Sequence, residues 1–301
     1  MLDPASLYTL EDELPPLVEA HLVVALSGFV DAGGAVRLAV QHLRGVCEHR
    51  VVATFDVDQL HDYRARRPLM TFSGDRWEDV DSPVLRVEVL RDPEGSALLL
   101  LHGPEPDVQW ERFVRAVWQL ADRLGVVHTT VLSAAPTAVP HTRPSGVTAS
   151  ATRPELLEGF RTWDVEAQVP GHAAALLALR GGQSGHDVLS VLAHVPHYLA
   201  GNEYPDAAAV LVRTIAGVTG LSLPVQSLQE AASATRVEVD AQVADSAEAA
   251  AVVRALEEQY DAQGDEGRGT GAAEAFLPTA DELGAEFERF LARQEDEPGT
   301  E

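Results

Sequence analysis

The sequence predicts an α/β protein in which helices cover both faces of a mixed, mostly parallel β-sheet. Between residues 22 and 218, short apolar runs alternate with segments of helical periodicity, an order typical of a largely parallel sheet. Several runs are apolar throughout, as in strands that are buried on both faces. Two of the runs flank a turn at residues 92–95, which predicts an antiparallel hairpin and makes the sheet mixed.

Each expected strand is a short apolar run, and each expected helix has an apolar face. Strands are expected at residues 22–26, 51–55, 84–90, 97–101, 126–132, 165–169 and 188–195. Helices are expected at residues 35–44, 107–124, 172–179 and 206–218. Asp107 is the expected N-cap of the second helix, and Gly125 lies where its C-terminal cap belongs. Residues 58–79 are polar and rich in arginine, and we expect them to form a long loop.

A change in composition near Arg236 divides the chain into an α/β domain (residues 1–235) and an acidic helical appendage (residues 236–301). The last 64 residues contain 18 Asp and Glu against 4 Arg. We expect one helix from about residue 245 to residue 260. A second is expected from Thr279, which Glu282 follows at capping-box spacing. A Gly-rich linker at residues 264–273 separates the two helices.

The charge and the residue types argue against several classes of function. A formal net charge of −25 disfavours nucleic acid and anionic membrane surfaces, both of which would repel the chain. All 22 basic residues are arginines, so the protein has no lysine for a Schiff base or a P-loop. Cys47 is the only cysteine, so no intramolecular disulfide can form, which suits the cytoplasm. We expect no signal peptide, and no apolar stretch approaches the roughly 20 residues that span a bilayer.

A glycine turn follows the first expected strand and carries Gly28, Asp31, Gly33 and Gly34. The helix expected from Ala35 begins directly after it, so free N–H groups and the positive end of the helix dipole favour an anion site. The segment lacks the Lys-Ser/Thr of a P-loop, however, and Asp31 places a negative charge in the turn. In the alternative interpretation, Asp31 is the N-cap and the glycines permit tight packing.

The loop at residues 136–144 follows the C-terminal end of an expected strand, where ligands bind in open α/β sheets. His141 could exchange protons there, and Arg143 could bind a carboxylate or a phosphate. In the alternative interpretation, the prolines stiffen the loop and Arg143 forms a surface ion pair.

A third loop, after the strand at residues 188–195, carries His197, Tyr198 and Asn202 close together. Pro196 breaks helical geometry between His194 and His197, so these two rings need not share a face. The chain has no cysteine ligands and no H-E-x-x-H motif, so we expect no metal and no cofactor. Packing and loop hydrogen bonds are the alternative role of these side chains.

Three segments carry a resemblance to a known family: LSGFVDAGGA at residues 26–35, PHTRP at residues 140–144 and VPHYLAGNEYPDAA at residues 195–208. In combination they resemble the actinobacterial branch of the PAC2 (proteasome assembly chaperone) family. The resemblance covers residues 7–234 and implies a three-layer αβα fold of the phosphorylase/hydrolase-like class. Eukaryotic and archaeal relatives bind proteasome α-ring subunits without catalysis, which implies a protein partner. The hydrophobic-Tyr-X tail by which some relatives dock is not found at residues 299–301.

Two hypotheses of function follow. In the first, the chain is a non-catalytic binding protein of proteasome-related assembly. We expect a homo-oligomer, because the apolar stripes of the appendage need to be covered, and the alternative is that they dock back on their own domain. In the second, it is an enzyme or a sensor that binds a small anionic or nucleoside-like ligand at the strand ends. The expected pocket of the second hypothesis combines the three loops at Gly28, Asp31, Gly33, Gly34, His141, Arg143, His197, Tyr198 and Asn202.

Overall fold

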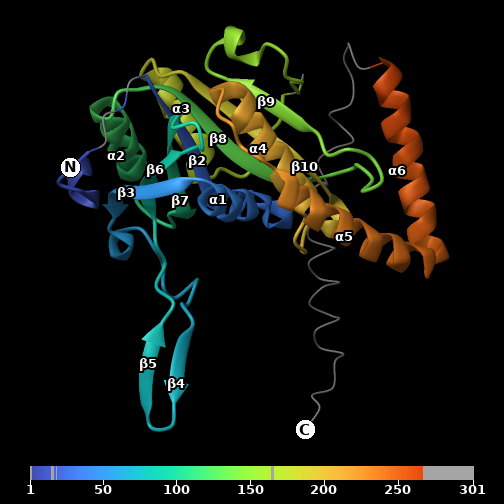
Figure 1. Cartoon of the computed structure of the whole chain (residues 1–301), viewed down its shortest axis with the longest axis horizontal. Coiled ribbons are helices and arrows are strands. Elements are labelled where there is room, and N and C mark those ends of the chain that lie inside the picture. The colour runs from blue at the N-terminus through green and yellow to red at the C-terminus, as the bar shows by residue number, and fades with distance from the viewer. Residues whose placement is uncertain (1, 15–16, 18, 164–165, 267–301) are drawn as a thin grey trace.

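The computed structural model describes residues 2–14, 17, 19–163 and 166–266. Its centre is an eight-stranded sheet in the order β1-β3-β6-β7-β2-β8-β10-β9 (Figure 1). The neighbours β7, β2, β8 and β10 are parallel, and the remaining strands run antiparallel to theirs, which confirms the mixed sheet. The strands are β1 (Tyr8–Leu10), β2 (Ala20–Ser27), β3 (Glu48–Phe55), β6 (Arg86–Arg91), β7 (Ala97–Pro104), β8 (Val126–Thr137), β9 (Val147–Ala151) and β10 (Val188–Pro196).

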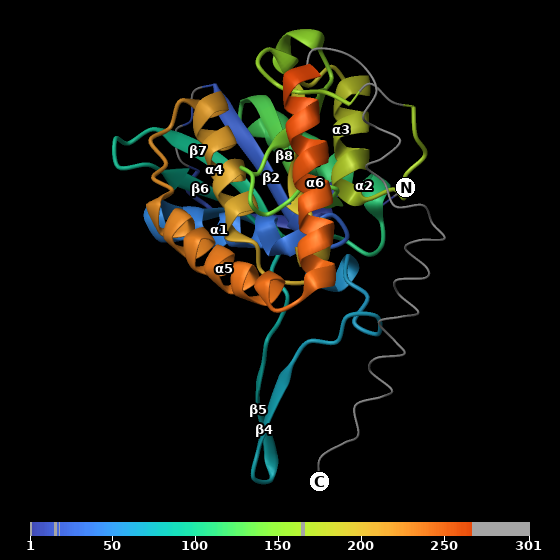
Figure 2. The same ribbon diagram turned by 90° about the vertical axis from the view of Figure 1, so that its right-hand side faces the viewer.

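Helices cover both faces of this sheet and give three layers (Figure 2). On one face lie α1 (Ala35–Val46) and α4 (Pro205–Thr219), and on the other lie α2 (Trp110–Arg123) and α3 (Ala173–Gln183). Side chains of β2 alternate between the two cores, with Val23 in the α1–α4 core and Val24 in the α2–α3 core. The predicted α/β class is therefore confirmed.

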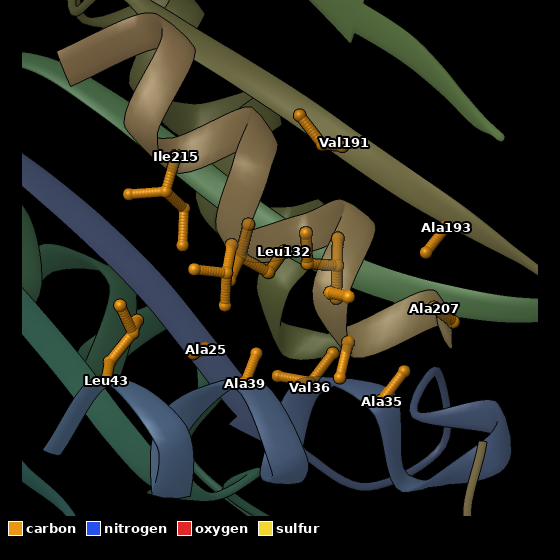
Figure 3. Close-up of a cluster of buried hydrophobic side chains, with 14 of the residues drawn as sticks. Ala25, Ala35, Val36, Ala39, Leu43, Leu132, Val191, Ala193, Ala207 and Ile215 are labelled. Atoms are coloured by element: carbon orange, nitrogen blue, oxygen red, sulfur yellow. The ribbon is translucent and has the colours of Figure 1, made fainter. Parts of the chain in front are cut away.

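Small side chains line the contact of α1 and α4 with the sheet. Ala35 and Ala39 of α1 and Ala207 of α4 are fully buried, and Figure 3 shows them facing Leu132 of β8 and its neighbours. Alanine lets the helix backbones approach each other closely while the leucines and valines fill the remaining space. Only 6% of the residues are aromatic, and the core is dense because alanine permits this close approach.

The second helix begins later than expected. α2 starts at Trp110 after Gln109, which has a left-handed backbone with φ 59°. Asp107 is not its N-cap, because its carboxylate accepts the backbone N–H of Asp62 (2.6 Å) and pairs with Arg66 (2.6 Å). The other end agrees with the prediction, since Gly125 follows the helix with a φ of +68°.

We expected residues 58–79 to form a loop, but part of this segment is regular structure. The segment contains most of a β-hairpin, made of β4 (Met70–Ser73) and β5 (Arg76–Val80), which projects far from the sheet (Figures 1 and 2). We call residues 69–80 the arm. The local signal was present, because Gly74, with a φ of +64°, opens a two-residue turn between alternating apolar and polar residues.

The C-terminal part of the described chain forms two long helices, α5 (Gln226–Ala244) and α6 (Ala247–Glu266). α6 contains most of the helix expected at residues 245–260. α5 was not predicted, because only three of its nineteen residues are buried and its apolar pattern is weak. It passes through residue 235, where the α/β domain was expected to end.

Some expected elements are absent from the structure or lie outside the described residues. The strand expected at residues 165–169 is wrong for residues 166–169, which have no regular structure, and residue 165 lies outside the described residues. The linker expected at residues 264–273 is wrong for residues 264–266, which are the last residues of α6. The rest of the linker and the helix expected from Thr279 lie outside the described residues. Within residues 2–14, 17, 19–163 and 166–266, no helix has both the length and the apolar character needed to cross a membrane.

Candidate functional site

The glycine turn after β2 lies against the segment that follows β10. The Gly33 N–H donates to the carbonyl of Ala200 (2.8 Å), and the Tyr204 N–H donates to the carbonyl of Gly33 (2.8 Å). Gly33 has a φ of +64°, and a Cβ at this position would lie 2.7 Å from the Cβ of Tyr204. Only glycine fits this conformation and this close approach. Gly34 is also left-handed, with a φ of +56°.

The Asp31 side chain contacts the first turn of the helix that follows. Its carboxylate accepts the N–H of Val36 in α1 (2.7 Å), although Gly34 and not Asp31 occupies the N-cap position of α1. The alternative interpretation is therefore right about the contact and wrong about the position. Burial raises the pKa of Asp31 to about 6, although hydrogen bonds from the backbone of Val36 and Arg37 and the charge of Arg37 act in the opposite direction. The carboxyl group therefore changes its protonation state close to neutral pH.

Gly28 faces a different neighbour. A Cβ on Gly28 would lie 2.8 Å from the side chain of Glu105, whose other oxygen accepts the N–H of Ala173 at the start of α3 (2.6 Å). The carboxylate thus occupies the N-terminal end of α3, where it is electrostatically favoured. Gly28 is placed towards the α3 layer, whereas Gly33 contacts the segment before α4.

His141 is the centre of a hydrogen-bonded group that joins three distant parts of the chain. Its Nδ1 lies 2.7 Å from the hydroxyl of Tyr198, and its Nε2 lies 3.1 Å from the carboxylate of Asp240 on α5. The Tyr198 hydroxyl also accepts the backbone N–H of His141 (2.9 Å). The side chain of His141 is only 2% exposed.

These contacts define the donors and acceptors of the group. The Asp240 carboxylate can only accept, so Nε2 of His141 carries a proton and donates it. The Tyr198 hydroxyl accepts from the His141 backbone and has its own proton for Nδ1, which is then the acceptor. Burial, together with the nearby Tyr204, Glu257 and Asp240, raises the pKa of Tyr198 to about 12, although the hydrogen bond from the His141 backbone lowers it. Tyr198 is therefore a neutral phenol at pH 7.

The residues next to His141 are held by α6. The guanidinium of Arg143 makes a two-pronged contact with Asp261 (2.8 and 2.6 Å) and pairs with Glu257. Thr142 donates its hydroxyl proton to Glu257 (2.5 Å), and Tyr260 donates to the carbonyl of Pro144 (3.3 Å). The ion-pair interpretation of Arg143 is therefore confirmed, with partners on a helix that the sequence assigned to a separate appendage.

Little open space remains among these groups. A cavity of about 10 Å³ lies between His141, Tyr204, Asp206 and Arg236, which is room for about one water molecule. Of the other expected pocket residues, His197 and Asn202 are exposed, and the Asn202 N–H donates to the carbonyl of Leu199. Within the described chain no group of three His, Cys, Asp or Glu side chains has the arrangement of a metal site. The open pocket that combines the three loops stays a prediction.

The sequence analysis missed the acidic side chains that complete this region, Asp240 on α5 and Glu257 and Asp261 on α6. One signal was available, because Glu257 and Asp261 are four residues apart and so lie on the same face of a helix. Nothing local pairs this face with Arg143, which is 118 residues away from Asp261.

Comparisons with known proteins agree with this architecture. The model of the PAC2 family matches residues 25–243. A Mycobacterium tuberculosis protein of unknown function, Rv2714, is 48% identical over 86% of this chain and 92% of its own, with a TM-score of 0.82. A protein of unknown function from Corynebacterium glutamicum is 37% identical over 87% of this chain and 99% of its own, with a TM-score of 0.83.

Another similar solved structure carries a described role. Rv2125 from Mycobacterium tuberculosis, described as a proteasome-assembly chaperone homologue, is 26% identical over 77% of this chain and 99% of its own, with a TM-score of 0.72. A search of the curated proteins gave no match. The family model spans well over half of the chain, and two solved relatives exceed 30% identity over most of its length. The chain therefore belongs to the PAC2 family.

Proposed function

We propose that this chain is a non-catalytic binding protein that takes part in proteasome-related assembly. Membership of the PAC2 family supports this proposal, as does its similarity to the proteasome-assembly chaperone homologue Rv2125. The contacts of α5 and α6 support it as well, since they fill the region in which an enzyme of this fold would need an open pocket.

The observation that carries the proposal is the arm. Its large apolar side chains are turned to solvent, with exposed fractions of 79% for Leu69, 55% for Phe72 and 62% for Trp77. The rings of Phe72 and Trp77 meet edge to face, 5.1 Å apart, and touch no other aromatic ring among the described residues. Because an isolated two-stranded hairpin is marginally stable in water, such a surface is typical of one that another protein chain covers.

A second copy of this chain is the occupant of the arm in this proposal, so the working form is a homo-oligomer. Each strand of the arm has one unpaired edge, and a second copy of the chain presents matching edges with which these can pair. The proteasome subunits then bind elsewhere on the oligomer. We also propose the cytoplasm as its compartment, where the single thiol of Cys47 stays reduced.

Two measurements on purified proteins test the proposal. Light scattering after size-exclusion chromatography is expected to give a multiple of the chain mass for the wild type and the chain mass for Phe72→Ser/Trp77→Ser. Val237→Ser, which removes an apolar side chain that is 69% exposed on α5, is the matched control and is expected to keep the wild-type mass. A monomeric wild type would refute the role of the arm.

The partner is tested by capture of purified 20S α-subunits on immobilised protein. We expect the wild type and Val237→Ser to retain the subunits and the monomeric arm variant to retain them less, because it presents one binding surface instead of several. Retention no greater than that on an unrelated acidic protein would contradict the assembly function.

The second candidate function, a ligand sensor, is favoured by one observation. Asp31, with its raised pKa, and the pair of His141 and Tyr198 follow the ends of the parallel strands β2, β8 and β10 at the same edge of the sheet, and Asp240 of α5 contacts His141. Such groups are typical of binding sites. In a thermal-shift screen of nucleosides and nucleotides, a ligand at 100 times its Kd would stabilise the fold by about 2.7 kcal/mol. Arg143→Gln, which frees α6, is expected to enlarge the response, and a flat response of both proteins would remove this candidate.

A further inference from the structure

A cleft with a volume of about 420 Å³ lies at the opposite edge of the sheet. Its walls come from the N-terminal segment at Glu13 and Leu14, from the start of β3 at Glu48 and Arg50, and from the end of β6 at Val89 and Arg91. β3 runs in the same direction as β7 and β2, so its start and the glycine turn mark opposite ends of these strands. This cleft is therefore separate from the site described above.

The register of β3 and β6 brings four of the cleft side chains onto one face, whereas His49, which also lines the cleft, lies opposite Leu90. Glu48 lies opposite Arg91, and Arg50 lies opposite Val89, in the antiparallel pairing. Val89 is 4% exposed and belongs to the core beneath α2, and Leu14 packs against the same core. The cleft thus has an apolar base with two arginines at its rim.

The two arginines are held in position but have most of their donors free. Arg50 donates to the carbonyl of Glu13 (3.1 Å), and Arg91 donates to the carbonyl of Gly95 (3.1 Å). Neither forms an ion pair with another described residue, unlike Arg143 with its two carboxylates. A guanidinium has five N–H donors, so each of these contacts uses one and leaves four.

We propose that this cleft binds a small ligand through an oxyanion, either a phosphate or a carboxylate, held between Arg50 and Arg91. The planar fork of a guanidinium matches both oxyanions with paired hydrogen bonds. The apolar part of the ligand lies on Leu14 and Val89. The volume falls within the range of about 300–1,000 Å³ that is usual for small-molecule sites. Glu48, opposite Arg91, competes with the ligand for the guanidinium.

The first test separates specific binding from the general effect of salt. Because the chain carries a net charge of −25, any salt will stabilise it by screening repulsion. The melting temperature is therefore measured in sodium phosphate, in sodium citrate and in sodium chloride at equal ionic strength. Phosphate and citrate also stabilise proteins by their exclusion from the surface, so the same series is measured on Arg50→Gln/Arg91→Gln. We expect phosphate or citrate to raise the melting temperature of the wild type several degrees more than that of the variant, and whichever anion does so identifies the headgroup. Equal rises in both proteins would overturn the proposal.

Variants of the cleft give the second test, with the affinity of the stronger anion measured by calorimetry. Arg50→Gln/Arg91→Gln is expected to weaken binding at least tenfold. The matched control Arg64→Gln/Arg67→Gln removes two exposed arginines near the arm and is expected to bind as the wild type does.

Glu48→Gln provides a test that does not depend on losing an arginine. Since it removes the competing carboxylate, we expect binding at least twofold tighter than wild type. Unchanged or weaker binding would place the anion away from Arg91 and overturn the proposal. Arg143→Gln leaves the cleft intact and is expected to bind the anion as the wild type does, which distinguishes the cleft from the site of the second candidate function.

Discussion

Replacing Asp31 with asparagine should stabilise this protein at neutral and alkaline pH. The asparagine side-chain oxygen can still accept the N–H of Val36, so the contact with α1 is kept while the charge is removed. The negative charge of Asp31 opposes folding, because burial raises the pKa of its carboxyl group from 3.8 to about 6. The substitution therefore keeps the hydrogen bond to Val36 and removes only the titrating carboxyl group.

The magnitude follows from this difference in pKa. A folded-state pKa above the unfolded value means that the protonated carboxyl favours folding. Its contribution is complete below pH 3.8 and is lost as the pH rises through about 6. Each pKa unit corresponds to about 1.4 kcal/mol, so two units give at most about 3 kcal/mol. Asp31→Asn does not lose this stabilisation. Its free energy of unfolding should therefore exceed that of the wild type by an amount that rises from near zero at pH 4 to about 2–3 kcal/mol at pH 8.

Urea unfolding of both proteins between pH 4 and pH 8 measures this gain. The difference between variant and wild type cancels the titration of all other carboxyls. Asp31→Ser, which keeps an acceptor oxygen without an amide, is expected to show the same dependence on pH. A gain that does not change with pH, or a loss of stability at pH 8, would refute the assignment of a buried charge to Asp31.

Three further predictions concern other parts of the fold. Gly33→Ala should destabilise the protein by more than 1 kcal/mol, because a Cβ there is strained and clashes with Tyr204. Gly74 has the same φ of +64°, but a Cβ there would meet no other atom. Gly74→Ala should therefore lose only the stability that the backbone strain costs, and chemical denaturation compares the two variants. Glu88→Gln should destabilise the fold by about 3–5 kcal/mol at pH 7 in the same assay, since it leaves Arg44 and Arg86 without their buried partner. Arg143→Gln should speed hydrogen exchange in α6 and leave exchange in β8 unchanged, and protection of α6 equal to wild type would contradict its role.

Much of the architecture could be predicted because its signals are local. The apolar run of β2, the turn between β6 and β7 and the glycine after α2 each depend on residues within a few positions of one another. Asp107 shows where such reasoning ends. A capping residue was expected there, but its carboxylate binds Arg66 and the backbone of Asp62, which approach only in the folded chain.

The arm and α5 were missed for different reasons. The alternation of the arm was legible, but its polar surroundings suggested a loop, and a hairpin without a buried face is unusual in a compact domain. α5 has too few buried residues for a clear helical pattern, so its contacts with α4 and His141 decide its position.

The residues alone determined the α/β class, the glycine turn before α1 and the absence of lysine chemistry, since these follow from local pattern and composition. Only the tertiary structure decided that α5 and α6 lie over the loop at residues 140–144. His141 meets Asp240 across 99 positions and Arg143 meets Asp261 across 118. Such pairings depend on how the whole chain folds back on itself, because a charged side chain by itself favours any opposite charge or water equally well.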